Sequence, residues 1–503
     1  MKKRTSFFQK ILDAIERVGN KLPDPFIIFV ILAVLMLFVS FVFNLFDASV
    51  VHPGTGEEEP VKSLLSGEGL QFILTSMIDN FTGFAPLGIV IVMMLGIGLA
   101  EKVGMLDYAI RKTIMKAPGA LLTYLLVFVG IMGNLAADAA NVLIPPLGAL
   151  VFYKVGRHPL AGLAAGFAGA GAGFTANLAI AGTDAVLSGL TTEAASIVNE
   201  SFVVTPADNW FFNIFSTLVL TVVGGLVTSR VIEPRLGTYD GDAAEEEEEE
   251  ELPHAKRGIV LALIAALVYA AIIFVSLIPH DSPLRGENGS ITNSPFLDGI
   301  VPLIFFLFVI MGVTFGMTVG KIQKSKDVSH YMGEAMKDMT NFIVLAFAIA
   351  QFVEFFSWSN MGVWVAVHGA NFLESINFTG FGLVVGYIIF TAIMNLFITS
   401  GSAKWSIEGP IFVPMFMQLG YHPAFTQIAY RVADSSMNIV TPLYPYMIIV
   451  LSFMQRYDNK ANIGTYISLM LPYSIAFLIS WIILLAIFYF TGMPYGPGVH
   501  TFM

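Results

Sequence analysis

The chain has 503 residues, of which 56% are hydrophobic and 13% charged, and its mean hydropathy is +0.75. Soluble proteins carry about 25% charged residues, so this composition excludes a soluble globular protein and indicates a polytopic membrane protein. Cysteine is absent, which excludes disulfides and thiolate metal sites. The net charge of -11 includes seven consecutive glutamates, Glu245 to Glu251, in a predicted acidic cytoplasmic linker at 233–257. Such a run is typical of a solvated linker, so the charge identifies no partner and no nucleic acid is expected to bind.

Nine apolar segments are long enough to cross a bilayer as helices, because about 20 residues span its core. In chain order they cover 26–46, 84–101, 158–190, 209–231, 258–279, 298–320, 341–357, 422–455 and 463–491. Two further apolar stretches, about 118–153 and about 379–419, are interrupted by polar residues at their middles. That pattern favours hairpins that enter and leave the membrane on one side. The sequence therefore predicts an all-α polytopic membrane protein with about nine transmembrane helices and two re-entrant helical hairpins.

Lysine and arginine are distributed unevenly between the two predicted sides of the membrane. With the N-terminus in the cytoplasm, the cytoplasmic segments hold 22 of the 26 basic residues. Lys62 and Arg285 lie on the other side, and Lys404 and Arg431 lie within membrane segments. This asymmetry agrees with the positive-inside rule and predicts a periplasmic C-terminus. Counting either hairpin as two full crossings would leave the orientation unchanged, so the rule does not prove that the hairpins are re-entrant.

The chain contains traces of an internal duplication. A Gly-x-His-Pro motif occurs at 156–159 and again at 420–423, and Asn134-Leu135 in the first hairpin corresponds to Asn395-Leu396 in the second. Both halves run through two spanning helices, an amphipathic stretch, a hairpin, a broken helix and a closing helix. Five crossings per unit turn the second unit upside down, which predicts two inverted repeats. Such repeats place substrate and ion sites near the bilayer midplane, between discontinuous helices.

The predicted units are a first inverted repeat at 1–232 and a second half at 258–503 that contains the second repeat. The broken helices are expected at about 158–190 and about 422–455.

The first half offers two candidate sites. The tip of the first hairpin carries Asn134, Asp138 and Asn141, and polar groups at membrane depth usually have a function. The alternative is an ordinary loop in water. The first broken helix has four glycines in Gly166–Gly173, which weaken the helix and would free carbonyl oxygens for a hard cation. Asp184 follows in an apolar run and could bind a cation or carry a proton, or it could cap a helix in water.

The tip of the second hairpin is also polar. Trp405 offers a flat stacking surface, and Ser402 is among the neighbouring hydroxyls that could orient a polar ligand. The alternative for Trp405 is a place in the interfacial aromatic belt. Lys404 and Glu408 lie four residues apart and could simply pair on one helical face.

The second broken helix contains Arg431, Asp434 and Asn438, followed by Pro442 and Pro445, which break the helix and free carbonyl groups upstream. A buried arginine is costly unless it is paired, and its guanidinium can hold a carboxylate in a bidentate grip. The alternative is that Arg431 only neutralises Asp434, since residues three apart share a helical face.

At these residues the chain resembles the p-aminobenzoyl-glutamate transporter (AbgT) family. The resemblance covers essentially the whole chain. It rests on the Asn-Leu hairpin tips, Gly182-Thr183-Asp184, the run from Ser400 to Trp405, the His-Pro pair ending at Pro423, and Arg431-x-x-Asp434-Ser-Ser-x-Asn438 ahead of Thr441-Pro442. The run in the second half is specific to that family, whereas the glycine-rich run is not.

The resemblance implies a homodimer in the bacterial inner membrane, each protomer having a scaffold and a moving transport domain. It also implies uptake of aminobenzoyl-glutamate or export of sulfonamide-like antimetabolites, driven by a cation gradient and without a cofactor. Family roles correspond to Asp184, Trp405, Pro423, Arg431 and Asp434 around the substrate path, with Asn395 near a cation site.

The chemistry of these residues suits a substrate with an aromatic ring and two carboxylates. Trp405 could stack on the ring and Arg431 could bind a carboxylate. We expect Asp184, Asp434, Asn395, Asn438 and freed carbonyl groups to hold Na+ or relay H+, because such oxygens serve both ions. The hairpin-bearing domain would then cross the membrane as a unit, in an elevator-like cycle.

Three other functions are compatible with the pattern. A dicarboxylate or citrate carrier has a similar architecture, although the single membrane arginine and Trp405 favour an aromatic substrate. An intramembrane hydrolase is disfavoured, because no base is evident beside the serines near Asp434. A passive channel would differ from a carrier in showing no counterflow.

Overall fold

The computed structural model describes most of the chain, namely residues 23–51, 56–115, 118–119, 121–136, 139–239, 241, 252–286, 289–291 and 294–503. The glutamate run and Asp138, which the sequence placed in the linker and at the first hairpin tip, lie outside the described residues.

The first half is helical apart from one short β-ribbon. Its helices are α2 (Pro25–Leu45), α3 (Gly67–Thr82), α4 (Ala85–Lys102), α5 (Met105–Met115), α6 (Leu122–Met132), α7 (Ala139–Lys154), α8 (Pro159–Phe167), α9 (Gly182–Ser196), α10 (Trp210–Val227) and α11 (Glu233–Leu236). Three short helical turns join them: the 3-10 helix η1 (Gly133–Ala136) and the π-helices η2 (Ala168–Ala172) and η3 (Thr228–Ile232). The strands β1 (Ser49–Val51) and β2 (Glu58–Pro60) pair antiparallel.

The second half repeats this order of elements. Its helices are α12 (Ala255–Leu277), α13 (Pro295–Asp298), α14 (Ile300–Thr318), α15 (Ser325–Asp338), α16 (Thr340–Trp358), α17 (Met361–Ser375), α18 (Gly380–Met394), α19 (Gly401–Gln418), α20 (Pro423–Met437), α21 (Tyr446–Gln455) and α22 (Ile463–Thr491), with the 3-10 turn η5 (Asn438–Val440) after α20. From α14 onward each element has a counterpart in the first half. The pairs of antiparallel arms α6–α7 and α18–α19 form the two hairpins.

The expected class of fold, an all-α polytopic membrane protein, is confirmed. Among the described residues, seven helices are long and apolar enough to cross a membrane. The pair α17–α18, bent by 119° at its break, would bring the number to eight if it forms one span, against the nine expected. Two helices were not expected, α3 and α15. Both are short, and α15 is strongly amphipathic, so neither stands out as an apolar run.

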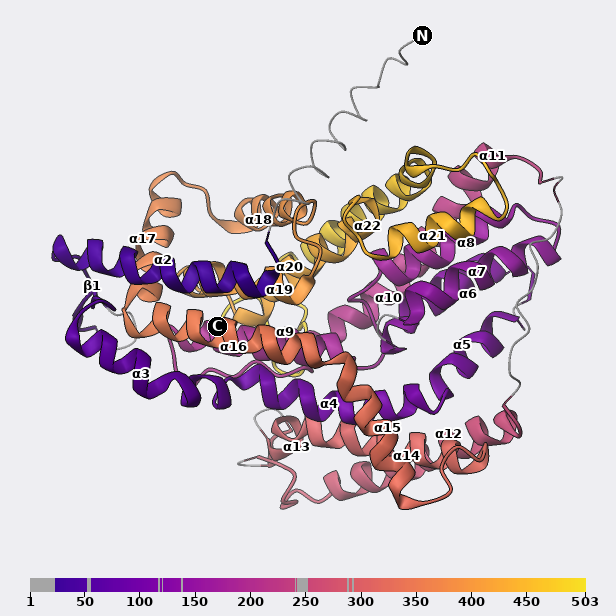
Figure 1. The fold of residues 1–503 in the computed structure, drawn as a ribbon, viewed down its shortest axis with the longest axis horizontal. Helices are drawn as coiled ribbons and strands as arrows, with labels where there is room; N and C mark the ends of the chain where they lie inside the picture. Colours follow the sequence, from indigo (N-terminus) through magenta and orange to yellow (C-terminus); the bar gives the residue numbers. More distant parts are fainter. Residues whose placement is uncertain are drawn as a thin grey trace, which may run out of the picture.

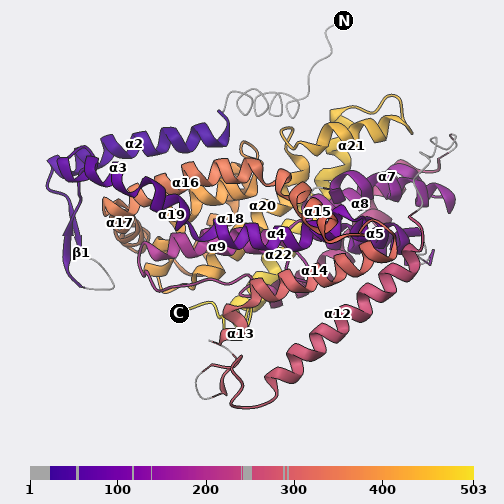
Figure 2. The ribbon, with the colours of Figure 1, turned by 60° about the horizontal axis from the view of Figure 1, so that its bottom comes forward.

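The outermost helices present apolar side chains to the surroundings. α2 and α12 are hardly buried along their apolar windows, at 17% and 11% of the residues. They lie at opposite edges of the molecule (Figures 1 and 2). Leu267 and Phe274 on α12 are among the most exposed apolar side chains. Exposed apolar surface of this extent requires a lipid or protein environment.

The two Gly-x-His-Pro motifs have the same local geometry. Gly156 and Gly420 adopt positive φ angles of 74° and 84°, which glycine tolerates without strain. The following histidines, His158 and His422, are the N-caps of α8 and α20. Each accepts a hydrogen bond at 3.2 Å on Nδ1 from the backbone N–H two residues on. Proline then occupies the first helical position, where a missing N–H is harmless. The motif therefore caps the start of the broken helix in both halves.

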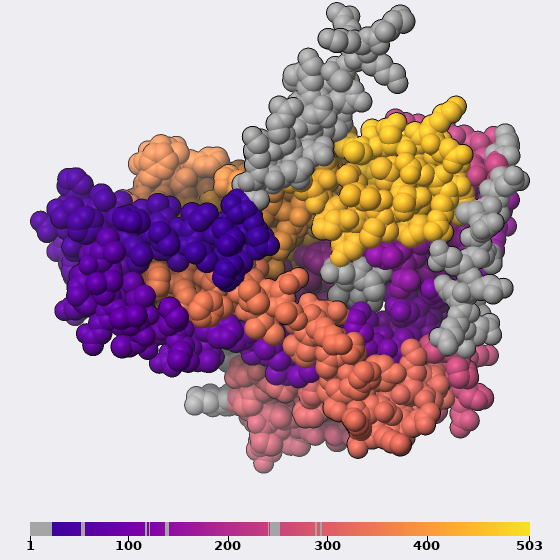
Figure 3. All heavy atoms as spheres, viewed as in Figure 1, coloured from indigo at the N-terminus to yellow at the C-terminus, as the bar shows by residue number. Residues whose placement is uncertain are grey.

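The hairpins and broken helices meet in the middle of the molecule. In Figure 1, α6, α7, α8 and α10 gather with α21 and α22 on one side, and α19 and α20 lie toward the centre with α9. α4 packs between α14 and α9 and so connects the outer layer to this centre. In the space-filling view the surface is hollowed between the segment around α15 and the C-terminal segment of α21 and α22 (Figure 3).

Candidate functional site

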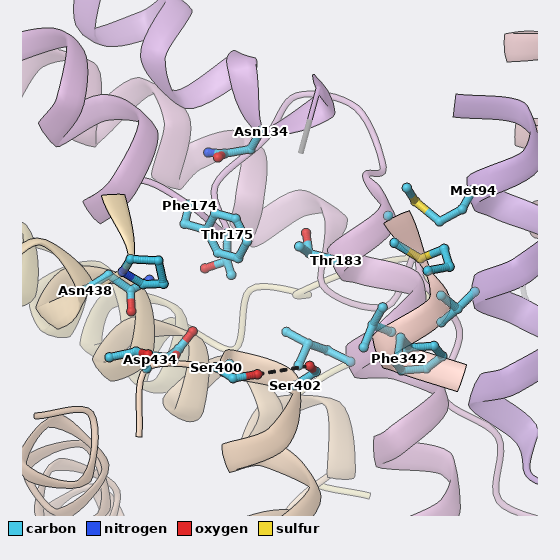
Figure 4. Close-up of a pocket in the computed structure, with 18 of the residues that line it drawn as sticks. Met94, Asn134, Phe174, Thr175, Thr183, Phe342, Ser400, Ser402, Asp434 and Asn438 are labelled. Atoms are coloured by element: carbon cyan, nitrogen blue, oxygen red, sulfur yellow. Dashed lines mark hydrogen bonds between the residues drawn. The ribbon is translucent and has the colours of Figure 1, made fainter. Parts of the chain in front are cut away.

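A cavity of about 390 Å³ lies where the two hairpin tips face the breaks of the two broken helices (Figure 4). Its polar wall comes from both halves of the chain: Asn134, Thr175, Thr183, Thr399, Ser400, Ser402, Asp434 and Asn438. Apolar side chains such as Met94 of α4 and Phe342 of α16 form the opposite wall. A mainly apolar pocket with a few convergent polar groups is the usual form of a small-molecule site.

The break in the first helix follows from its glycines, as predicted. After α8 the chain forms one π-helical turn, and regular structure stops from Gly173 until α9 begins at Gly182. The Asn134 amide of the first hairpin tip donates to the carbonyls of Ile131 at 2.9 Å and Gly173 at 3.4 Å, so the tip is fixed to the break. Thr175 Oγ1 and Ser435 Oγ are 2.6 Å apart, which connects this break to α20 of the other half.

The second hairpin tip and α20 form a polar cluster, which we define as Asn395, Lys404, Asp434 and Asn438. The Lys404 Nζ lies 2.8 Å from Asp434 Oδ1 and also donates to Asn395 Oδ1. The Asn395 amide donates to the Asp434 carbonyl at 2.8 Å and to Asn438 Oδ1 at 3.1 Å. The cluster is buried, yet Asp434 and Asn438 reach the cavity wall.

A second buried ion pair joins the two halves. Arg431 Nη1 on α20 lies 2.6 Å from Asp184 Oδ1 on α9. The other contacts of Asp184 are the backbone N–H of Ala181 at 2.7 Å and the Asn213 amide at 3.2 Å. Arg431 also donates from Nε to Gln427 Oε1 at 3.2 Å. Both charges are hydrogen-bonded from several sides, as buried charges must be.

Trp405 and Pro423 lie behind the cavity wall. Trp405 is completely buried, its Nε1 donates to Thr191 Oγ1 at 3.0 Å, and its ring packs on Tyr430 with centroids 4.6 Å apart. Pro423 occupies the first position of α20 and is buried. Neither residue lines the cavity, and neither do Asp184, Arg431 or Asn395. Of the predicted site residues, the wall holds Asn134, Ser402, Asp434 and Asn438, whereas Asn141 is buried away from it.

Several alternatives left open by the sequence are decided by burial. Asp184, at 1% exposure, is not a cap in water, and Trp405, at 0%, is not in an interfacial belt. Asn134 is 3% exposed, so this residue of the first hairpin does not lie in water.

Both pairings suggested by helical spacing are wrong. Arg431 pairs with Asp184 of the other half rather than with Asp434, and Lys404 pairs with Asp434 rather than with Glu408. The carboxylate of Glu408 instead accepts hydrogen bonds from the hydroxyls of Tyr387 at 2.9 Å and Thr391 at 2.6 Å. The sequence analysis missed Gln427, Asn213 and Thr175, because an isolated polar residue in an apolar run carries no signal of its partner.

This arrangement defines the class of protein. Two helical repeats, each with a hairpin and a broken helix that meet at a shared cavity, are the architecture of a secondary transporter. The chain matches the model of the AbgT putative transporter family over residues 10–503, and it belongs to that family.

Proteins of known function and known structure are similar over nearly the whole length. The p-aminobenzoyl-glutamate transport protein of Escherichia coli (strain K12) is 44% identical over 493 residues, which cover 98% of this chain and 97% of that protein.

Two proteins of solved structure have the same fold. The YdaH transporter of Alcanivorax borkumensis superposes with a TM-score of 0.90 at 39% identity, covering 94% of this chain and all of that one. MtrF of Neisseria gonorrhoeae, described as illuminating a class of antimetabolite efflux pumps, superposes with a TM-score of 0.91 at 41% identity, covering 97% and 100%. The chain is thus a membrane transporter of small molecules.

Proposed function

We propose that the protein is a cation-coupled transporter of aromatic carboxylates such as p-aminobenzoyl-glutamate, or an exporter of sulfonamide-type antimetabolites. The observation that carries the proposal is the cavity walled by both hairpin tips and both helix breaks, with two buried ion pairs directly behind it. The relatives named for aminobenzoyl-glutamate transport and antimetabolite efflux support the substrate class.

The coupling cation, Na+ or H+, would bind at the polar cluster of the second hairpin. Asn395, Asp434 and Asn438 bring carboxylate and amide oxygens together, and hard cations prefer such oxygen ligands. Asp184 would take part through its ion pair with Arg431. No cofactor is needed in this scheme.

The substrate would enter the cavity from the side of Thr183 and Ser402, whose hydroxyls lie on its wall. Arg431 is positioned to exchange the Asp184 carboxylate for a carboxylate of the substrate, because a guanidinium binds either in the same way. Trp405 would reach the aromatic ring only after the second hairpin moves, since it is buried against Tyr430 in this conformation. Pro423 would contribute by fixing the start of α20.

Around this site we propose two inverted repeats at 1–232 and 258–503 joined by the acidic linker. The protein would reside as a homodimer in the bacterial inner membrane, with a cytoplasmic N-terminus and a periplasmic C-terminus. The exposed apolar faces of α2 and α12 would contact lipid or the second protomer. The chain would act as a carrier and not as an enzyme or a channel.

Flux measurements in proteoliposomes test this proposal. Labelled p-aminobenzoyl-glutamate and a labelled sulfonamide are followed while a Na+ gradient and a pH gradient are imposed separately. One gradient should drive accumulation, and Asp434→Asn should abolish that driving force. Asp338→Asn is the matched control, because Asp338 forms an ion pair with Lys102 at 2.6 Å and does not line the cavity. Flux that ignores both gradients would refute coupling, and competition by citrate would favour the dicarboxylate carrier.

A further inference from the structure

Lys404 places a positive charge in the buried interior of the protein. Its side chain is 0% exposed, and Nζ lies 2.8 Å from Asp434 Oδ1 while donating to Asn395 Oδ1. The same ammonium lies 5.4 Å from the centroid of the Tyr430 ring, which favours a cation at that position. The ammonium therefore occupies the oxygens that the proposed function assigns to the coupling cation. A bound cation and the lysine cannot both hold these oxygens, because like charges at such distances repel strongly in a buried site.

A second carboxylate lies within reach of the same ammonium. Glu408 is four residues further along α19, so it shares a helical face with Lys404. Its Oε2 accepts hydrogen bonds from Tyr387 and Thr391, whereas its Oε1 is buried and has no hydrogen-bond partner among the described residues. A buried carboxylate oxygen without a partner is unfavourable, so it offers an acceptor for a displaced ammonium.

We propose that Lys404 is a tethered counter-cation that alternates between these two carboxylates. In the cation-free site the ammonium would keep its contacts with Asp434 and Asn395. When the coupling cation arrives at Asp434, the ammonium moves to Oε1 of Glu408. The exchange replaces one positive charge by another, so the coupling cation carries a single charge. Because the cluster supplies carboxylate and amide oxygens, which are the ligands that hard metal cations prefer, we assign Na+. This inference rests on the proposed function, since it presupposes that a cation binds at Asp434.

The tethered charge has a specific role in a transport cycle. Net transport requires one step in which the site crosses the membrane without its cation, and an unpaired carboxylate in a low-dielectric environment would resist that step. With Lys404 present, Asp434 is neutralised whether or not Na+ is bound. Removal of Lys404 should therefore block the cation-free step while leaving the cation-bound step intact.

Two assays on the full-length protein in proteoliposomes separate these steps. Net flux of labelled p-aminobenzoyl-glutamate under a Na+ gradient requires the cation-free step. Exchange of ²²Na+ for unlabelled Na+ uses only the cation-bound step. For Lys404→Gln we expect net flux to fall about 100-fold, with ²²Na+ exchange within about threefold of the wild type, since the coupling oxygens remain. Lys404→Arg keeps the charge and should retain part of the net flux. Lys102→Gln, which removes an ammonium from the ion pair with Asp338, is the matched control and should change neither assay.

Glu408→Gln tests the second position independently. The displaced ammonium would lose its charged acceptor, so the Na+ concentration for half-maximal exchange should rise about tenfold or more. Net flux at saturating Na+ should remain, because the pairing with Asp434 is intact. Lys404→Gln should thus lose net flux and keep ²²Na+ exchange, whereas Glu408→Gln should keep net flux and need more Na+ for exchange. A variant that merely misfolds would lose both activities.

Unchanged net flux in Lys404→Gln would overturn the proposal, and so would equal loss of both activities in a Lys404→Gln protein whose melting temperature matches that of the wild type. An unchanged Na+ dependence in Glu408→Gln would overturn the second position of the lysine. A wild-type protein that accumulates substrate under a pH gradient but exchanges no ²²Na+ would refute this inference and leave the proposed function standing. A wild-type protein that responds to neither gradient would refute the proposed function itself.

Discussion

The two hairpin regions of the molecule share one framework and differ in their chemistry. Each pairs a hairpin with a broken helix that begins at the same histidine cap. In the first region the hairpin packs against the broken helix through glycines and small apolar residues, and Asp184 on α9 is its buried charge. In the second region the corresponding space holds a lysine, an arginine and an aspartate. Both halves therefore share the geometry of the site, while three of the four charges in its two ion pairs come from the second half.

The first region is packed too closely for side chains at its centre. Gly148 of α7 and Gly162 of α8 face each other, so that a methyl group on either would overlap the backbone of the other. Behind this contact, Asn141 and Asn177 are fully buried, and their amide groups have no hydrogen-bond partner among the described residues. This region acts as a close-packed support.

Ion pairs stabilise the second region, and one of them also links it to the first region. The pair of Arg431 and Asp184 crosses from α20 to α9, and the Thr175–Ser435 hydrogen bond crosses at the neighbouring break. The two halves are therefore connected at the cavity by polar contacts. A ligand can replace such contacts more readily than it can replace close packing between glycines.

Replacing Arg431 should have the largest effect, because Arg431 links the two regions by charge. Arg431→Ala leaves Asp184 buried without its counter-ion, and breaking a buried pair from one side costs about 3–5 kcal/mol. We expect transport to be lost and the apparent melting temperature of the purified protein to fall by several degrees. Arg157→Ala is the control, because it breaks a partly exposed ion pair with Glu233 at 2.6 Å and should cost about 1 kcal/mol or less. Similar effects of the two substitutions would show that the cavity pair has no special importance.

An alanine at corresponding positions of α8 and α20 should destabilise the first region more than the second. Gly162→Ala forces α8 away from α7, and overpacking of this kind costs roughly 1–3 kcal/mol. Thr426 occupies the corresponding position of α20, and its buried hydroxyl has no partner among the described residues, so Thr426→Ala should cost less. The comparison of melting temperatures for the two alanine variants measures the difference in packing. Equal losses would mean that both helices are packed to the same tightness.

The sequence predicted the framework well because each of its features has a local cause. Apolar length marks the crossings, glycines mark the first break, and Pro442 with the neighbouring Pro445 marks the second. Even so, prolines were not reliable breakers, since Pro146 and Pro410 lie inside α7 and α19 without ending them.

The contacts of the site were less predictable, because they join residues far apart in the chain. Arg431 and Asp184 are 247 residues apart, and no spacing rule within one helix could pair them. The short-range rule pointed to Asp434 and Glu408 instead. Sequence identified which residues carry charge in the membrane, and only the fold shows which of them meet.

Both histidine caps should make the protein less stable in acid. Burial lowers the pKa of His422 to about 4 from its usual 6.5, and it lowers the pKa of His158 as well. Since the unfolded chain binds the proton first, stability should decrease as the pH falls from about 6.5 toward 4, by up to about 1.4 kcal/mol per pH unit. His422→Asn keeps a capping acceptor without titrating, so its melting temperature should vary less with pH over that range. An unchanged pH profile in this variant would show that other groups dominate.

We expect the smallest change in stability from a substitution of Asn141 in the first region. Asn141→Leu replaces a buried amide that makes no hydrogen bond in the described structure, so the change should alter stability by less than about 1 kcal/mol or even increase it. Asn395→Leu is the matched substitution in the second hairpin, and it deprives Lys404 and Asn438 of their partner at a cost of about 1–3 kcal/mol. Melting temperatures and net flux should be measured for both. If Asn141→Leu is as harmful as Asn395→Leu, the amide of Asn141 must bind a water molecule or an ion, and the first region is then a second polar site and not merely a support.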